Sequence, residues 1–305
     1  MEDLIKYKII IRETGDHHSP IGYDWYLGFI EAGCDVALVK SAATLRDCPT
    51  DVDVYVDMVD IEDPHALAYA KRLKEDNPKS KVLAAVLHPL DKQEKCFDYV
   101  DYWFDCGYEH LMYNEWYGSR GQKFLSVLEG TNPKLFYKGE VDQSDVRDFS
   151  FIGQFGIHGH GYRGEDQYLF PLIDDTKLTN YLYGFGYKNH PLQHINYTQT
   201  NIIYNSTKIN LNFHYPEQKT TKTVINKRTF DIAGSGNFQL IDHPKFEELT
   251  GIKAYSDPKE YRDAFYYYVD KPEKRNEVAS RAQQIILEKH TWKVRMEDLL
   301  NKIYK

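Results

Sequence analysis

The sequence predicts an α/β protein made of two domains, each built on a mostly parallel sheet. Its 305 residues exceed the size at which one hydrophobic core usually keeps growing, so two medium domains are favoured over one. Strand-like and helix-like segments alternate over the first 100 residues, and the alternation resumes after residue 148. Alternation of this kind is typical of βαβ units on a parallel sheet.

The N-terminal half keeps a regular order of elements. Its strand-like segments are KYKIIIRE, DVALVK, DVDVYVDMV, KVLAAVLH and YVDYWFDC, and its helix-like segments are GYDWYLGFIEAG and ALAYAKRLKED. In the first helix Ile21, Trp25 and Phe29 recur at helical spacing, and Gly33 follows as a stop. Runs such as KVLAAVL have the Val and Leu content of buried parallel strands.

The pattern weakens between residues 107 and 148, where glycine, proline and acidic residues gather. Exposed linkers between domains have this composition. We therefore expect an N-terminal domain over residues 1–145 and a C-terminal domain over residues 146–305.

The C-terminal half alternates again. DFSFIGQF, NYLYGFG, KINLNFH, FQLIDH and KAYS are expected to be strands, and TQTNIIYNST and RTFDIAGSG are expected to be helices. Two of the three closing helices open at Pro258 and Pro272, because a missing N–H costs least in the first turn. The last helix carries a stripe that needs a partner surface, formed by Trp292, Met296, Leu299, Leu300 and Ile303.

Composition excludes several classes of protein. The formal net charge of −8 gives no global attraction to nucleic acid or to anionic lipid. No stretch is long and apolar enough for a membrane span, and the N-terminus turns polar too soon for a signal peptide, so we expect a cytoplasmic protein. The four cysteines lack CxxC spacing, which disfavours a zinc ribbon and a dithiol redox site.

A glycine-rich loop follows the first strand of the second half. GQFGIHGHGYRG holds five glycines in twelve residues, so its backbone N–H groups can approach a phosphate, and Arg163 can meet the charge. It lacks the GK[ST] ending of a P-loop. A flexible loop without a ligand is the alternative, and the pair His158 and His160 leaves metal binding open without an evident third ligand.

A second candidate anion site is the segment KRTFDIAGSG. Lys227 and Arg228 are expected to precede a helix that begins near Thr229, and cations at a helix N-terminus favour a pyrophosphate. Asp231, expected in the first turn, can accept hydrogen bonds from ribose or sugar hydroxyls. Alternatively, Asp231 only complements the helix dipole.

The segments NSTKINLNFHYP, KRTFDIAGSGNFQLIDH and AYSDPKEYRDAFYYYVDKPEKRNEVASRAQQIILEKHTWKVRMEDLL resemble the C-terminal domain of GT-B glycosyltransferases, close to the CgeB-like and family 4 enzymes. The resemblance covers about residues 149–300 and implies two Rossmann-like domains that face each other across a cleft. It also implies transfer of a sugar from a nucleotide-diphosphate sugar, held by the C-terminal domain, to a glycan or other hydroxyl acceptor, held by the N-terminal one. In that pattern the last helix, about residues 291–305, crosses back to the N-terminal domain.

The resemblance also implies roles for single residues. Arg228 falls on the arginine of the family's motif, Asp231 on its acidic position and Gly236 on its final glycine. Gly153 and Arg163 fall on the loop and the basic residue that approach the donor phosphates. Two departures matter: Asp231 is one methylene shorter than the usual Glu, and Thr223 stands where many family 4 enzymes carry a second Glu.

The mechanism implied needs no metal and no cofactor beyond the nucleotide sugar. Arg163, Lys227 and Arg228 are expected to stabilise the diphosphate that leaves, with Thr229 at the helix start and His214 also in contact with the donor. The resemblance favours retention of configuration. If the enzyme inverts instead, it needs a general base, for which the candidates are Asp16, His17 and His18.

Three rival functions stay open at this point. The first is a viral type of DNA base glycosyltransferase, which the net charge disfavours. The second is a non-catalytic nucleotide-sugar-binding module, which the changes at Asp231 and Thr223 favour. The third is a hydrolase that uses a metal at His158 and His160.

Overall fold

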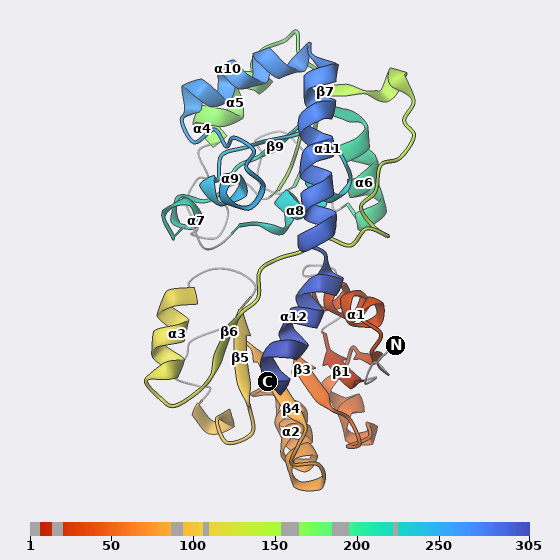
Figure 1. The fold of residues 1–305 in the computed structure, drawn as a ribbon, viewed down its shortest axis with the longest axis vertical. Helices are drawn as coiled ribbons and strands as arrows, with labels where there is room; N and C mark the ends of the chain where they lie inside the picture. The colour runs from red at the N-terminus through yellow and green to blue at the C-terminus, as the bar shows by residue number, and fades with distance from the viewer. Residues whose placement is uncertain are drawn as a thin grey trace. The chain divides into compact units, whose positions relative to one another are not determined.

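The computed structural model describes residues 7–13, 21–86, 94–105, 110–153, 165–184, 195–221 and 225–305. The chain divides into two compact units (Figure 1). The first comprises Met1–Leu128 together with Trp292–Lys305, and the second comprises Glu129–Thr291.

The first unit is built on a six-stranded sheet with the order β2-β1-β3-β4-β5-β6, in which every neighbouring pair is parallel. Its strands are β1 (Lys8–Arg12), β2 (Asp35–Val39), β3 (Val54–Asp57), β4 (Lys81–Ala85), β5 (Tyr102–Asp105) and β6 (Phe124–Ser126). Its helices are α1 (Ile21–Glu31), η1 (Ala42–Asp47), α2 (Pro64–Asp76), α3 (His110–Gly118) and α12 (Trp292–Tyr304). The strands of the N-terminal half are thus where the sequence predicts them, whereas β6 falls in the stretch expected to be irregular.

Helix α12 packs on helix α1 within the first unit. Trp292 is fully buried, and its ring centroid lies 6.4 Å from that of Trp25. Gly28 permits the close approach, because a Cβ at that position would lie 2.9 Å from the backbone of Trp292. The stripe predicted on the last helix therefore finds its partner surface here, in one apolar cluster with Phe29 and Met296.

The second unit is built on a four-stranded parallel sheet with the order β10-β9-β7-β8. Its strands are β7 (Arg147–Ile152), β8 (Asn180–Tyr183), β9 (Thr207–Asn212) and β10 (Gln239–Ile241). Its helices are η3 (Gln143–Asp145), α4 (Glu165–Tyr168), α5 (Phe170–Ile173), α6 (Tyr197–Asn205), α7 (Pro216–Thr221), α8 (Lys227–Gly234), α9 (Pro244–Thr250), α10 (Pro258–Val269) and α11 (Pro272–Lys289). Helices α10 and α11 open at the two prolines that predict them. The segment 253–256, expected to be a strand, is irregular, although the Tyr255 amide donates to the carbonyl of Ile241 at 2.8 Å.

The boundary between the units lies after Leu128, so the expected division after residue 145 is wrong. The reason is that the intervening residues pack on the second unit. Phe136 is fully buried against Tyr204 and Ile232, and the Lys138 ammonium donates to Asn237. Glycine and proline in this stretch thus mark irregular chain on the surface of the second unit.

Candidate functional site

The carboxyl ends of the strands in the second unit gather the residues that the sequence singles out. Ligands of open parallel sheets bind at this edge. Gly153 directly follows β7, His214 comes two residues after β9, and Asp242 directly follows β10. Helix α8 begins in the connection between β9 and β10, so its first turn belongs to the same edge of the sheet.

Helix α8 begins two residues earlier than the sequence predicts. Asn226 is its N-cap, and its side-chain oxygen accepts from the Thr229 amide at 3.1 Å. Capping by Asn satisfies an N–H that the helix itself leaves without a partner, and it fixes the start of the helix. Lys227 and Arg228 consequently lie inside the first turn, and Asp231 lies beyond it.

Arg228 lies beside the end of β7. Its guanidinium carbon is 4.9 Å from the centroid of the Phe151 ring, in a cation–π contact. Phe151 is fully buried and precedes Gly153 by two residues. The arginine of the motif therefore lies beside the strand that leads into the glycine-rich loop.

Lys227 and Asp231 form an ion pair along helix α8. The Lys227 ammonium lies 2.6 Å from Oδ2 of Asp231, and the two side chains are 16% and 7% exposed. The same ammonium lies 4.7 Å from the ring centroid of Phe136 and 4.8 Å from that of Tyr197. Lys227 thus neutralises the acidic position of the motif.

A network of buried amides, which the sequence analysis did not predict, fixes the first turn of α8. The Asn212 amide donates to Thr229 Oγ1 and to Gln239 Oε1, both at 2.9 Å. The Gln239 amide donates to the Thr229 carbonyl at 2.9 Å, and the Asn226 amide donates to Asn212 Oδ1 at 3.0 Å. The signal in the sequence was polar residues at alternate positions of a strand, KINLN, whose register with β10 brings them to helix α8.

His214 is fully buried and forms hydrogen bonds through both ring nitrogens. Its Nδ1 lies 2.9 Å from Asp242 Oδ1, and its Nε2 lies 3.5 Å from Thr229 Oγ1. Burial lowers the pKa of His214 to about 4, and the hydrogen bond to Asp242 only partly offsets this. At neutral pH the ring is therefore neutral, so Nδ1–H donates to Asp242 and Nε2 is an acceptor towards Thr229.

Asp242 fixes the orientation of His214 and also pairs with Lys219. Burial acts to raise the pKa of Asp242, but its hydrogen bonds to His214 and Lys219 and the charge of Lys219 outweigh burial and lower it. Its second oxygen lies 2.9 Å from the Lys219 ammonium. Lys219 and Asp242 were not predicted, although an acid directly after the apolar run FQLI is the signal that could have found Asp242.

Family comparison agrees with this site. The family model for glycosyl transferase-like proteins matches residues 147–301, just over half of the chain. The chain belongs to this family. Over 85 residues it is 32% identical to spore protein CgeB of Bacillus subtilis (strain 168). That match covers 25% of this chain and 27% of the relative, so it spans about a quarter of the relative's length.

Solved glycosyltransferases share the fold over nearly the whole chain. A glycosyltransferase from Rickettsia africae ESF-5 matches with a TM-score of 0.63 at 9% identity and covers 99% of both chains. HepE of Anabaena, solved in complex with UDP and glucose, matches with a TM-score of 0.60 at 11% identity and covers 98% of this chain and 99% of its own. The predicted GT-B fold class is thereby confirmed, and the family model makes the chain a member of the glycosyl transferase-like family.

The two glycines on which the family pattern falls have clear structural roles in this glycosyltransferase. Gly236 has a φ of +70° and lies past the C-terminal end of α8, where a Cβ would meet the side chain of Gln283 at 2.7 Å. It therefore lies at the opposite end of α8 from Arg228. Gly153 meets Gly184 at the end of the neighbouring strand, and a Cβ on Gly184 would overlap with the Gly153 carbonyl.

Several predicted residues of the glycosyltransferase lie outside the described residues. They are Asp16, His17, His18 and Arg163, together with the pair His158 and His160 and the departure Thr223. Among the residues that the structure does describe, no group of three or more His, Cys, Asp and Glu side chains is placed to hold a metal ion. Within the same described ranges, no helix has both the length and the apolar character needed to cross a bilayer.

Two charged residues end β1 in the first unit and were not predicted as functional. Arg12 is almost buried, and its Nη1 lies 2.9 Å from Oδ2 of Asp57. Burial raises the pKa of the next residue, Glu13, and the charge of Lys40 only partly offsets this. Both residues stand at the carboxyl end of β1, directly before the segment that holds the candidate base residues. Charged residues at the end of the apolar run IIIRE were the available signal.

Proposed function

We propose that the chain transfers a sugar from a nucleotide-diphosphate sugar to a glycan or other hydroxyl acceptor. The second unit binds the donor and the first unit binds the acceptor. The observation that carries the proposal is the first turn of α8, where Lys227 and Arg228 stand at a helix N-terminus beside the end of β7. The UDP and glucose named for the Anabaena relative support a nucleotide sugar as the donor.

The donor diphosphate lies at the N-terminus of α8 in this proposal. The helix dipole favours an anion there, and the planar guanidinium of Arg228 can form two parallel hydrogen bonds with phosphate oxygens. Gly153 opens the loop that brings Arg163 to the same phosphates. Asp231 accepts from a ribose or sugar hydroxyl beside its ion pair with Lys227.

His214 and Thr229 orient this turn. Because Asp242 fixes the tautomer of His214, the acceptor nitrogen of the ring faces the Thr229 hydroxyl. His214 is fully buried, so we assign it to positioning the helix turn beneath the diphosphate. Gly236, at the far end of α8, supports the helix through its turn and does not approach the donor.

The bond between the anomeric carbon and the diphosphate oxygen breaks, and the acceptor oxygen forms the new bond to that carbon while its proton passes to the leaving diphosphate. The cations at α8 stabilise the charge that develops on the leaving diphosphate, without a metal ion. We propose that configuration is retained. Asp16, His17 and His18 are the candidates for the proton acceptor that an inverting reaction would require.

A thermal-shift screen tests donor binding directly. We expect one of the diphosphates of uridine, guanosine and adenosine to raise the melting temperature of the wild type, because a ligand that binds only the folded state stabilises it. NMR of the glycosidic product would then read its anomeric configuration. Absence of a shift with every nucleotide and nucleotide sugar tested would contradict the donor site.

A further inference from the structure

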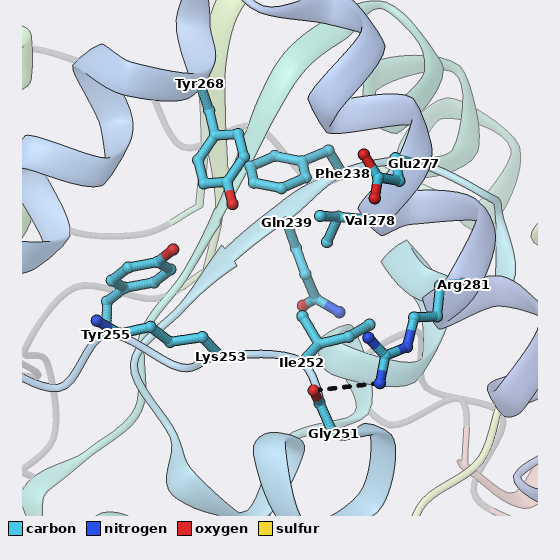
Figure 2. A pocket seen from close by; sticks show the side chains of 10 residues that line it. All are labelled: Phe238, Gln239, Gly251, Ile252, Lys253, Tyr255, Tyr268, Glu277, Val278 and Arg281. Atoms are coloured by element: carbon cyan, nitrogen blue, oxygen red, sulfur yellow. Dashed lines mark hydrogen bonds between the residues drawn. The ribbon is translucent and has the colours of Figure 1, made fainter.

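The second unit contains a pocket of about 160 Å3 away from the proposed donor site (Figure 2). Segment 251–255 and helices α10 and α11 surround it at the start of β10. Phe238 and Gln239 at this start line the pocket, whereas Asp242 follows the other end of the strand. A ligand in the pocket would therefore be distinct from the nucleotide sugar.

The apolar part of the lining consists mainly of aromatic rings. The rings of Phe238 and Tyr268 pack with centroids 4.6 Å apart, and the hydroxyl of Tyr255 faces that of Tyr268 (Figure 2). Burial raises the pKa of Tyr255, as does the hydrogen bond between its hydroxyl and that of Tyr268. Rings with hydroxyls suit a ligand that has an apolar face and polar edges.

The polar part of the lining combines donors with acceptors. The guanidinium of Arg281 donates to the Gly251 carbonyl at 3.4 Å, and the Glu277 carboxylate pairs with Lys274 at 2.9 Å. Gly251 adopts a φ of +65°, and a Cβ there would lie 2.9 Å from Arg281, so the turn at the end of α9 makes room for the guanidinium. Lys253 adds a second cation, 4.9 Å from the ring centroid of Tyr255.

We infer that this pocket binds a single pyranose ring, as a free sugar or as one unit of a glycan chain. Its volume is close to the roughly 150 Å3 of a cavity that binds benzene, so it has room for the ring of one pyranose. Sugar hydroxyls both donate and accept, so they match a lining that offers cations, a carboxylate and tyrosine hydroxyls together. A small anion fits less well because Glu277 would repel it, and an apolar ligand would leave these charged groups without hydration.

The pocket also touches the network beneath the donor helix. Gln239 is one of its lining residues, and the amide of the same side chain donates to the Thr229 carbonyl in α8. The pocket would nevertheless bind sugar whether or not the first turn of α8 binds a diphosphate, because the two sites lie at opposite ends of β10. The two ideas can therefore fail separately.

Saturation-transfer NMR titrations test the pocket with defined probes. We would titrate the full chain with the methyl glycopyranosides of glucose, galactose and mannose, with N-acetylglucosamine and with maltotetraose, with and without saturating UDP. At least one probe should bind, and Tyr255→Leu and Arg281→Ala should each weaken it at least tenfold. The controls Tyr267→Leu and Arg262→Ala, both on α10 and outside the pocket lining, should bind as the wild type does.

The length of the best probe identifies the source of the sugar. Maltotetraose that binds at least tenfold more tightly than the monosaccharides would indicate a glycan chain, whereas equal affinity would indicate a free sugar. The inference is overturned if no probe binds, if the two pocket variants bind as tightly as the controls, or if UDP displaces the sugar completely. A melting temperature within a few degrees of the wild type excludes misfolding as the cause of a loss, and a pocket variant that misfolds is replaced by Lys253→Ala under the same expectation.

Discussion

The guanidinium carbon of Arg228 lies 4.9 Å from the centroid of the Phe151 ring. Arg228 stands in the first turn of α8, and Phe151 is near the end of β7, so one contact joins the start of this helix to the strand that precedes the glycine-rich loop. The guanidinium is planar, and two of its N–H groups can donate to one oxyanion. This contact places the motif arginine at the strand edge that binds ligands in related sheets.

Arg228→Ala should abolish sugar transfer while the fold is retained. Removing one pre-placed donor to developing charge typically lowers the rate by about 100-fold to 1,000-fold. We expect the melting-temperature increase caused by the best nucleoside diphosphate to disappear as well. Product formation by NMR and the thermal shift with the nucleotide measure the two effects.

Two companion variants sharpen the test of Arg228. Arg228→Lys keeps the positive charge but loses the planar pair of N–H donors, so its activity should lie between those of the wild type and the alanine variant. Arg262→Ala, on helix α10, should leave both measurements unchanged. Transfer by Arg228→Ala at the rate of the wild type would remove the phosphate assignment.

Lys227→Met should destabilise the second unit by about 3 kcal/mol, because it leaves the carboxylate of Asp231 buried without its ammonium. Asp231→Asn should cost less, because the Lys227 ammonium that it leaves is more exposed than the carboxylate and still contacts the rings of Phe136 and Tyr197. The double variant should recover part of the loss, with a coupling energy of about 1–3 kcal/mol. Urea unfolding of the four proteins measures the cycle, and strictly additive effects would show that the ion pair contributes nothing.

Local patterns in the sequence predicted much of the fold. Pro258 and Pro272 mark the starts of α10 and α11 because proline is tolerated only in the first turn, and the Trp292 stripe predicts a buried face because its spacing is helical. The predicted domain boundary was misplaced because it depends on contacts that are not local. Whether residues 129–146 belong to one unit or the other depends on contacts with Tyr204 and Asn237, which are distant in sequence.

The sequence predicted the motif residues of the candidate site but not the buried residues that support them. Arg228 and Asp231 are visible in the sequence because the segment resembles a family motif. The contact of Asn212 with Thr229 and Gln239 depends on the register between β9 and β10, which no local pattern fixes. The predicted start of α8 was too late because the sequence alone did not identify Asn226 as the N-cap. That role depends on its side chain accepting from the Thr229 amide.

Stability should fall as the pH drops from about 6.5 towards 4, owing to His214. Burial lowers its pKa to about 4, so over this interval the unfolded chain binds a proton that the folded chain does not, and unfolding is favoured. A depression from 6.5 to about 4 corresponds to at most about 3 kcal/mol. Above the unfolded pKa the contribution of His214 is complete and does not change further.

His214→Asn should flatten this part of the pH profile relative to the wild type. The groups that face His214 are Asp242, Lys219, Arg228 and His243. Burial also lowers the pKa of His243, which adds to the slope of stability against pH in both proteins. The pKa of Asp242 is lowered too, so its contribution to stability is lost mainly at pH values below this interval. Urea midpoints at pH values from about 3.5 to about 7.5, which span the two pKa values of His214, give the comparison. Parallel profiles for the two proteins would show that protonation of His214 does not lower the stability of the folded protein.

Trp292→Ala should loosen the first unit and leave nucleotide binding by the second unit unchanged. The ring is fully buried beside Trp25, and its removal should cost about 3–5 kcal/mol through the cavity that remains. Hydrogen exchange read by mass spectrometry should rise in peptides from Ile21–Glu31 and stay constant in peptides from Lys227–Gly234. Lys293→Ala, the exposed neighbour on the same helix, should leave both peptides unchanged. Faster exchange in α8 of the Trp292 variant, or loss of the thermal shift with nucleotide, would mean that the last helix supports the donor site as well as the sheet on which it packs.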